Sequence, residues 1–312
     1  MSDRRTITIG TRGSALARWQ SDYVKALLGS SYPDVEVGIE VYTTRGDKIL
    51  SQPLPELGGK GLFTADLEAA LVGADIDVAV HSLKDLPTEN PDGLTIGAVP
   101  ERANPSDVLV TRGGHTLDTL PRGATVGTSS PRRASQLLHI RNDLKIANIR
   151  GNVDTRIRKT MDKDGPYDAV VFAYAGLERL ERLDVVSDVL DMEIMLPAPG
   201  QGALGVQCRD DESSRSLLSV INDLPTQLAV AGERAFLAGL GGGCSLPICA
   251  YGVLEDGRLD LRGRVLSPDG TNRIDVAGDV EARGVDDALS LGKRLAEQAL
   301  GSGADGLLNS CT

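Results

Sequence analysis

The sequence has few of the residues from which disulfide frameworks and zinc sites are built. Its 312 residues include four cysteines and three histidines; the cysteines form no CxxC pair and the histidines are scattered. A disulfide scaffold and a Cys/His zinc site are therefore not expected. The sequence also has no GxSxG elbow of the kind found in serine hydrolases and no GxxxxGK[ST] loop of the kind that transfers phosphate.

Long apolar runs are also absent. No stretch of 18 apolar residues occurs, so no membrane-spanning segment is expected. Residues 1–5 are charged and lead directly into a strand-like run at 6–9, without the apolar stretch of a secretory signal. These features predict a cytoplasmic location.

Lysine is scarce beside arginine. The chain has 8 lysines and 25 arginines, 16 of them within the first 182 residues, although its net charge is −11. The negative charge argues against a general nucleic-acid-binding surface. Guanidinium groups bind carboxylates and phosphates through two parallel hydrogen bonds, whereas lysine acts as a point charge. Compositional bias or salt adaptation would also explain the ratio, since Asp exceeds Glu by 30 to 14. The positions of the arginines along the chain distinguish this compositional explanation from a role in binding an anionic ligand.

A short apolar strand, a polar turn and a helix follow one another repeatedly over the first 200 residues. Ser14 is placed to cap a helix with a 3.6-residue apolar period, and Pro131 suits the first position of another helix. Strands are expected at 7–9, 77–80, 124–126, 146–149 and 168–174. Such alternation predicts parallel α/β sheets, which bind ligands beyond the carboxyl ends of their strands.

The arginines gather at these strand ends, which composition alone does not predict. The polar turns contain Arg12, Ser14, Lys84, Asp85, Thr128, Ser129, Ser130, Arg132, Arg133, Arg150 and Arg179. Cationic side chains beside helix N-termini favour a polyanionic ligand. Asp85 at such a place is either a general acid that stabilises a developing cation or a turn-capping carboxylate.

The pattern changes after about residue 223. A helix at 228–240 precedes three glycines and Cys244, two strands are expected at 258–266 and 272–280, and a last helix at 286–300. This order predicts a small α+β domain. We expect three domains in all: residues 1–102 with 200–222, residues 103–199, and residues 223–312.

The four cysteines differ in their surroundings. Cys244 follows three glycines, which leave its thiol uncrowded; it is either a covalent attachment point or a small buried residue after a turn. Cys208 and Cys249 lie in strand-like or apolar segments and are expected to pack in the core, while Cys311 near the C-terminus is not expected to have a role.

Nine motifs in order along the chain resemble those of the porphobilinogen deaminase family. They are TRGS (11–14), TRGD (44–47), GGKGLF (58–63), HSLKDLP (81–87), GTSSPRR (127–133), RGNV (150–153), AGL (175–177), PGQG (199–202), and ERA (233–235) with GGC (242–244). The resemblance covers essentially the whole chain.

The resemblance implies a fold and a reaction. It implies two α/β domains like those of type II periplasmic binding proteins and a third, α+β domain that carries the cofactor cysteine. The cofactor is dipyrromethane, held by a thioether to Cys244. Such enzymes join four porphobilinogens head to tail, expel ammonia at each step through an azafulvene, and release hydroxymethylbilane.

The resemblance also implies roles for individual residues. Asp85 matches the catalytic aspartate. The cofactor ligands implied are Cys244, Lys84, Thr128, Ser129, Ser130, Arg132, Arg133 and Arg150, and the substrate ligands are Arg12, Ser14, Arg156, Arg179, Lys60 and Phe63. Glu56 stands where many members have lysine, so the roles in the 58–63 loop rest on Lys60 and Phe63.

A non-catalytic two-lobed binding protein for a carboxylated small molecule is the main alternative, because one fold hosts many functions. The third domain and Cys244 argue against it. The enzyme is expected to act as a monomer on porphobilinogen, with no metal and no nucleic-acid or membrane partner.

Overall fold

The computed structural model describes residues 6–43, 64–242 and 246–309. The chain divides into two compact units, Met1–Arg102 with Ala203–Gln227 and Ala103–Gly202 with Leu228–Thr312. The division into three domains at the boundaries given above stays a prediction. Lys60, Phe63 and Cys244 lie outside the described residues.

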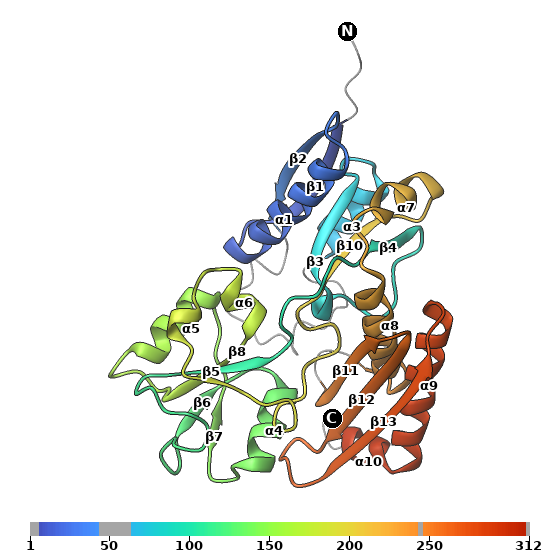
Figure 1. Ribbon diagram of the computed structural model, residues 1–312. Helices are drawn as coiled ribbons and strands as arrows, with labels where there is room; N and C mark the ends of the chain where they lie inside the picture. The colour runs from blue at the N-terminus through green and yellow to red at the C-terminus, as the bar shows by residue number, and fades with distance from the viewer. Residues whose placement is uncertain (1–5, 44–63, 243–245, 310–312) are drawn as a thin grey trace. The chain divides into compact units, whose positions relative to one another are not determined.

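The first unit is built on a five-stranded mixed sheet in the order β2-β1-β3-β10-β4 (Figure 1). Its strands are β1 (Thr6–Arg12), β2 (Glu36–Tyr42), β3 (Val78–Ser82), β4 (Leu94–Ala98) and β10 (Leu204–Arg209). Its helices are α1 (Ala15–Ser31), α3 (Ala65–Val72) and α7 (Glu212–Ser219), with a 3₁₀ turn, η2 (Leu83–Asp85). β1 runs parallel to β2 and β3, whereas β10 is antiparallel to β3 and β4.

Helix α1 begins as the sequence predicts. The Ser14 hydroxyl accepts a hydrogen bond from the Ala17 N–H at 3.2 Å, which caps the helix. Val24 and Leu28 are buried in the core, but Trp19 at the same period is 37% exposed and stacks on Tyr23. The apolar stripe is therefore only partly a core face.

The second unit contains another five-stranded mixed sheet, in the order β7-β6-β8-β5-β9. Its strands are β5 (Asp107–Thr111), β6 (Thr125–Gly127), β7 (Lys145–Ala147), β8 (Ala169–Ala173) and β9 (Asp188–Val189). Its helices are α4 (Pro131–Ile140), α5 (Val153–Met161) and α6 (Tyr174–Glu178), with η3 (Leu183–Val185). β6 is parallel to β7 and β8, and β5 is antiparallel to β8 and β9. Pro131 is the first residue of α4, as predicted.

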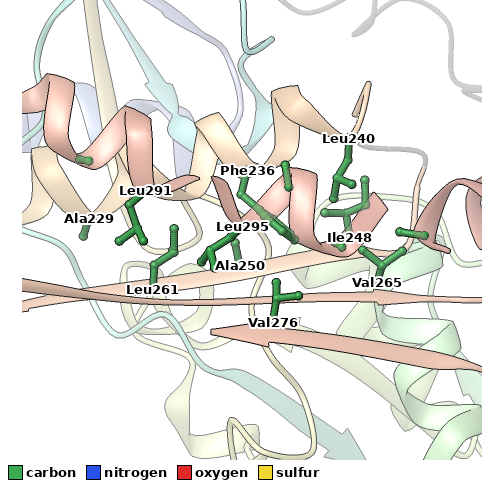
Figure 2. Packing of buried hydrophobic residues seen from close by; sticks show 14 of the residues in the cluster. Ala229, Phe236, Leu240, Ile248, Ala250, Leu261, Val265, Val276, Leu291 and Leu295 are labelled. Atoms are coloured by element: carbon green, nitrogen blue, oxygen red, sulfur yellow. The ribbon is translucent and has the colours of Figure 1, made fainter. Parts of the chain in front are cut away.

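The C-terminal part of the second unit is an antiparallel sheet packed against helices. Its strands are β11 (Ile248–Glu255), β12 (Arg258–Leu266) and β13 (Arg273–Glu281), and its helices are α8 (Leu224–Gly239), α9 (Val285–Gly301) and α10 (Ala304–Asn309). The predicted strand 258–266 coincides with β12, whereas the sequence reading missed β11 and α10. Phe236, Leu261 and Leu295 meet in the core between the helices and the sheet (Figure 2).

A buried glutamate attaches this sheet to the rest of the second unit. Glu233 of α8 is fully buried, and its carboxylate accepts from the Gly200 N–H at 2.6 Å and the Gly252 N–H at 2.8 Å. Hydrogen bonds to a carboxylate in a dry interior are among the stronger ones in proteins. Glu233 therefore joins α8, β11 and the 199–202 loop.

Candidate active site

In the first unit, three of the predicted site residues lie where two parallel strands end. Arg12 closes β1, and Lys84 and Asp85 lie in the η2 turn directly after β3. Ile9 of β1 pairs with Val78 of β3, so both strands end at the same edge of the sheet.

The η2 turn is fixed from two sides. The Gln20 amide of α1 donates to the Ser82 hydroxyl at 2.8 Å, and the Leu83 N–H donates to the Ala203 carbonyl at 3.0 Å. Asp85 is exposed and Lys84 is half-buried. The structure thus presents an accessible carboxylate on a fixed turn.

A histidine to which the sequence assigned no role lies in β3, two residues before this turn. His81 of β3 is buried, and desolvation lowers its pKa to about 4, with the positive charge of Arg12 adding to the shift. Its imidazole is therefore neutral at pH 7.

In the second unit, the carboxyl ends of β6, β7 and β8 carry the second group of predicted residues. The Ser129 hydroxyl donates to the Ile149 carbonyl at 2.8 Å and accepts from the Ile149 N–H at 3.2 Å. This pair of bonds holds the turn after β6 against the turn that carries Arg150. Ser130 caps α4 by accepting from the Arg133 N–H at 3.4 Å, and the Thr128 hydroxyl accepts from the Ser130 N–H at 3.1 Å.

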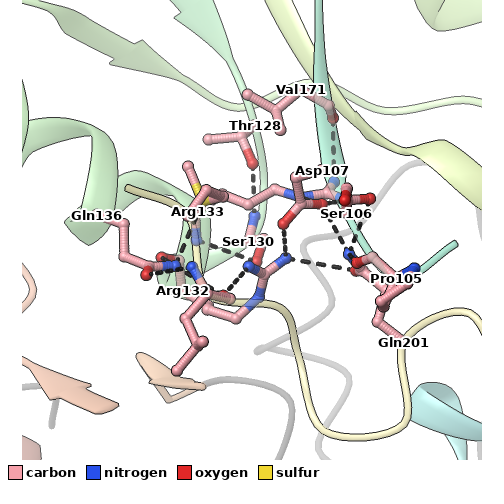
Figure 3. Close-up of polar contacts among 12 residues, drawn as sticks. Pro105, Ser106, Asp107, Thr128, Ser130, Arg132, Arg133, Gln136, Val171 and Gln201 are labelled. Carbon is pink, nitrogen blue, oxygen red and sulfur yellow. Dashed lines mark hydrogen bonds and ion pairs between the residues drawn. The ribbon is translucent and has the colours of Figure 1, made fainter. Parts of the chain in front are cut away.

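Arg132 and Arg133 are buried and share one carboxylate (Figure 3). Arg133 donates from Nε and Nη2 to Asp107 Oδ1 at 3.0 and 2.6 Å, and Arg132 Nη2 lies 2.7 Å from Asp107 Oδ2. Both guanidinium groups also donate to backbone carbonyls, of Leu196 and Val171. Their side chains are therefore held in one orientation.

The other two predicted arginines contact the backbone near the same sheet edge. Arg156 Nε donates to the Gly151 carbonyl at 2.8 Å, and Arg179, just after α6, donates from Nη2 to the Gly202 carbonyl at 2.7 Å. The second unit therefore brings together five predicted arginines and three predicted hydroxyls. Arg12, Ser14, Lys84 and Asp85 belong to the first unit.

The sequence did not predict the buried hydrogen bonds that Asp107, Gln136, Gln201 and Glu233 make in this part of the second unit. A signal for Asp107 exists: it opens an otherwise apolar run, Val108-Leu109-Val110, where a charge needs a partner. Gln201 and Glu233 lie within the PGQG and ERA motifs, but nothing local shows what they contact.

The donor set of the second unit suits a ligand with several carboxylates. Cationic side chains, hydroxyls and the N-terminus of the ten-residue helix α4 all stabilise negative charge. Cys208 and Cys249 are buried as predicted, and burial raises their thiol pKa values to about 11 and 12. At both positions burial favours the neutral thiol over the nucleophilic thiolate, as expected of core cysteines.

These features define a multidomain α/β protein whose strand-end turns are suited to holding a polycarboxylate. Residues 7–216 match the model of the "Porphobilinogen deaminase, dipyromethane cofactor binding domain", and residues 227–301 match the "Porphobilinogen deaminase, C-terminal domain". The chain belongs to the porphobilinogen deaminase family.

Curated porphobilinogen deaminases are similar in sequence to this chain over nearly its whole length. The chain is 48% identical over 306 residues to the porphobilinogen deaminase of Pelotomaculum thermopropionicum, covering 98% of this chain and 96% of that one. It is 46% identical over 302 residues to that of Brevibacillus brevis, covering 96% of each. The predicted enzyme class and the dipyrromethane cofactor are therefore confirmed.

The predicted fold class, two α/β domains with a small α+β domain, is confirmed by the family match and the three sheets. The effector-binding domain of BenM, solved with benzoate, aligns with 70% of this chain and 90% of its own at 15% identity. The TM-score of this alignment is 0.41. Within the described ranges, every helix is too short or too polar to cross a membrane.

Proposed function

We propose that the residues at these two strand edges carry out the condensation of four porphobilinogens into hydroxymethylbilane. Each porphobilinogen carries an acetate and a propionate, so the growing chain gains two negative charges per ring. The gathering of Arg132, Arg133 and Arg150 at one sheet edge is the observation that carries the proposal. A charge-assisted hydrogen bond contributes about 1.5–3 kcal/mol, so several can hold such a polyanion on a net negative protein.

In this proposal the arginines and hydroxyls of the second unit bind the cofactor carboxylates, and Lys84 assists from the first unit. Arg12, Ser14, Arg156 and Arg179 bind substrate carboxylates. When bound, dipyrromethane supplies the pyrrole carbon to which the first substrate is joined. Lys60 and Phe63 are proposed to contact substrate as well.

Asp85 is the proposed catalytic residue. Its exposed carboxylate accepts hydrogen bonds from pyrrole N–H groups and stabilises the positive charge that develops on the substrate. It also assists departure of the amine. Because Ser82, just before η2, is hydrogen-bonded to α1, and Leu83 is hydrogen-bonded to Ala203, the backbone that carries Asp85 is held in place before substrate arrives.

Cys244 is the proposed thioether anchor. Burial raises the thiol pKa values of Cys208 and Cys249 and so disfavours their nucleophilic thiolate forms, whereas Cys244 follows three glycines in the sequence and lies within the family's GGC motif. A monomeric state, a cytoplasmic location, the absence of nucleic-acid and membrane partners, and the three-domain division also belong to this proposal.

Intact mass under denaturing conditions tests the proposal. The purified chain should carry a covalent addition with the mass of dipyrromethane, and Cys244→Ser should carry none. Cys208→Ser is the matched control, because a buried core thiol should not affect the addition. A bare wild-type chain would favour the binding-protein alternative, and an addition that persists in Cys244→Ser would exclude Cys244 as the anchor.

A further inference from the structure

Asp107 has no part in the proposed reaction, yet it lies at the sheet edge that carries the cofactor-binding turn. Its side chain is 0% exposed. It opens β5, which is antiparallel to β8, and it pairs there with Ala173, the last residue of β8. The start of β5 therefore lies at the edge where β8 and its parallel neighbour β6 end.

Both oxygens of this carboxylate are used to hold arginines. Oδ1 accepts from Arg133 Nε and Nη2, Oδ2 lies 2.7 Å from Arg132 Nη2, and the Gln201 amide donates to Oδ1 at 3.1 Å (Figure 3). Gln201 is fixed in turn, because it also donates to the Pro105 carbonyl at 2.6 Å. Asp107 is thus the common partner of two neighbouring guanidinium groups.

The charge of Asp107 works against an acidic ligand. Two guanidinium groups and one carboxylate leave one net positive charge in this buried cluster. Replacing the carboxylate by a neutral amide would leave two, and Coulomb attraction for a polycarboxylate would rise. If charge alone governed binding, Asp107 would weaken it.

We propose that Asp107 is a positioning residue for cofactor attachment. It holds Arg132 and Arg133 side by side in the orientation that the cofactor carboxylates require. The gain in cofactor binding from this ordering is larger than the loss of Coulomb attraction that the negative charge of Asp107 causes. Arginine side chains lose considerable rotamer entropy when they bind, so side chains that are ordered in advance bind more tightly. The proposal rests on the proposed role of Arg132 and Arg133 as cofactor ligands.

Cofactor loading of folded protein tests this role. Asp107→Asn, Asp107→Glu and wild-type chains are purified as folded species by size exclusion, and chains without cofactor are incubated with increasing porphobilinogen. Intact mass then gives the porphobilinogen concentration at which half of the chains carry the covalent addition. We expect this concentration to rise about tenfold in Asp107→Asn, the loss of one good charge-assisted contact. Asp107→Glu, which keeps the charge, should lie between Asp107→Asn and the wild type.

Asp143→Asn is the matched control. Asp143 accepts from Arg141 Nε and Nη2 at 2.7 and 2.8 Å in the same unit, but it has no contact with the turn at 128–133 among its described bonds. Its loss should lower thermal stability and leave the half-loading concentration unchanged. If Asp107→Asn also changes only stability, or loads at the wild-type concentration or below it, the positioning role is wrong.

A second comparison tests the positioning role if the Asp107→Asn single variant does not fold. Arg133→Met combined with Asp107→Asn has the same net cluster charge as the wild type, so it avoids a surplus of buried charge. Positioning predicts that this double variant loads less readily than Arg133→Met alone, whereas charge alone predicts the reverse. Normal loading of Arg132→Gln and of Arg133→Gln would instead overturn the proposed ligand roles.

Discussion

Asp85 is the residue on which the proposed chemistry depends. Because its side chain is exposed, a substitution there should change catalysis without destabilising the fold. We expect Asp85→Asn to fold normally and to lose about 10²–10⁴-fold in turnover, because the amide keeps the shape but not the charge. Porphobilinogen consumption measures the effect. Asp92→Asn, another exposed aspartate of the first unit, should retain full activity. Near-normal turnover of Asp85→Asn would remove Asp85 from its proposed role.

His81 makes stability depend on pH. Its folded pKa of about 4 lies below the ordinary value of 6.5, so the unfolded chain binds the proton more tightly. This contribution to stability is therefore complete above pH 6.5 and is lost as the pH falls towards 4. We expect protonation of His81 to lower the free energy of unfolding by about 2 kcal/mol between pH 7 and pH 5.

Urea unfolding at the two pH values measures this loss. The difference should largely vanish in His81→Asn, and it should persist in His115→Asn, where the histidine is half-buried. An unchanged pH dependence in His81→Asn would show that other groups are responsible.

At the scale of elements, the turn between β12 and β13 packs closely against α4. His139 Nδ1 lies 2.8 Å from the Gly270 carbonyl, and a Cβ on Gly270 would lie 2.5 Å from the Ser135 carbonyl oxygen. Gly270 also has a φ of +73°, which disfavours other residues. This glycine therefore allows the C-terminal sheet to approach α4, the helix that begins at the turn proposed to bind the cofactor.

Two glycine substitutions separate backbone strain from close contact. Gly257 has a φ of +80°, but its Cβ would meet nothing within 4 Å. We expect Gly257→Ala to lower the free energy of unfolding by about 1 kcal/mol, from strain alone. Gly270→Ala should lower it by at least twice as much, because the clash adds to the strain. Equal effects in denaturant titrations would contradict the close contact.

Local signals predicted some elements and could not predict others. The Ser14 cap, the Pro131 start of α4 and the β12 strand depend on neighbouring residues, so the sequence was enough. β11 was missed because its segment begins beside proline and cysteine and has no clear alternation. β5 was missed because its few apolar residues have no helix after them.

At the scale of the whole molecule, the net charge of −11 disfavours self-association. We expect sedimentation equilibrium to give the mass of one chain, 32.9 kDa plus the cofactor, at moderate salt. The expectation should also hold for Cys244→Ser, because this substitution leaves the net charge of the chain unchanged. A mass of twice that value for both proteins would refute the monomer.

The sequence by itself determined the family and its cofactor, and it supplied the residues that are proposed to bind the ligands. Motifs such as HSLKDLP and GTSSPRR are contiguous, so both the identity of the side chains and the local turn are encoded in a few neighbouring residues. The arginine-rich turns and the acidic side chain at Asp85 could therefore be recognised without coordinates.

The tertiary structure alone decided what holds those residues in place. Asp107 reaches Arg132 and Arg133 because β5 runs antiparallel to β8, and Glu233 reaches Gly200 and Gly252 from a helix that local pattern showed only as apolar. Strand direction and long-range pairing depend on how distant segments bury their apolar faces together, and no short stretch of sequence contains that information.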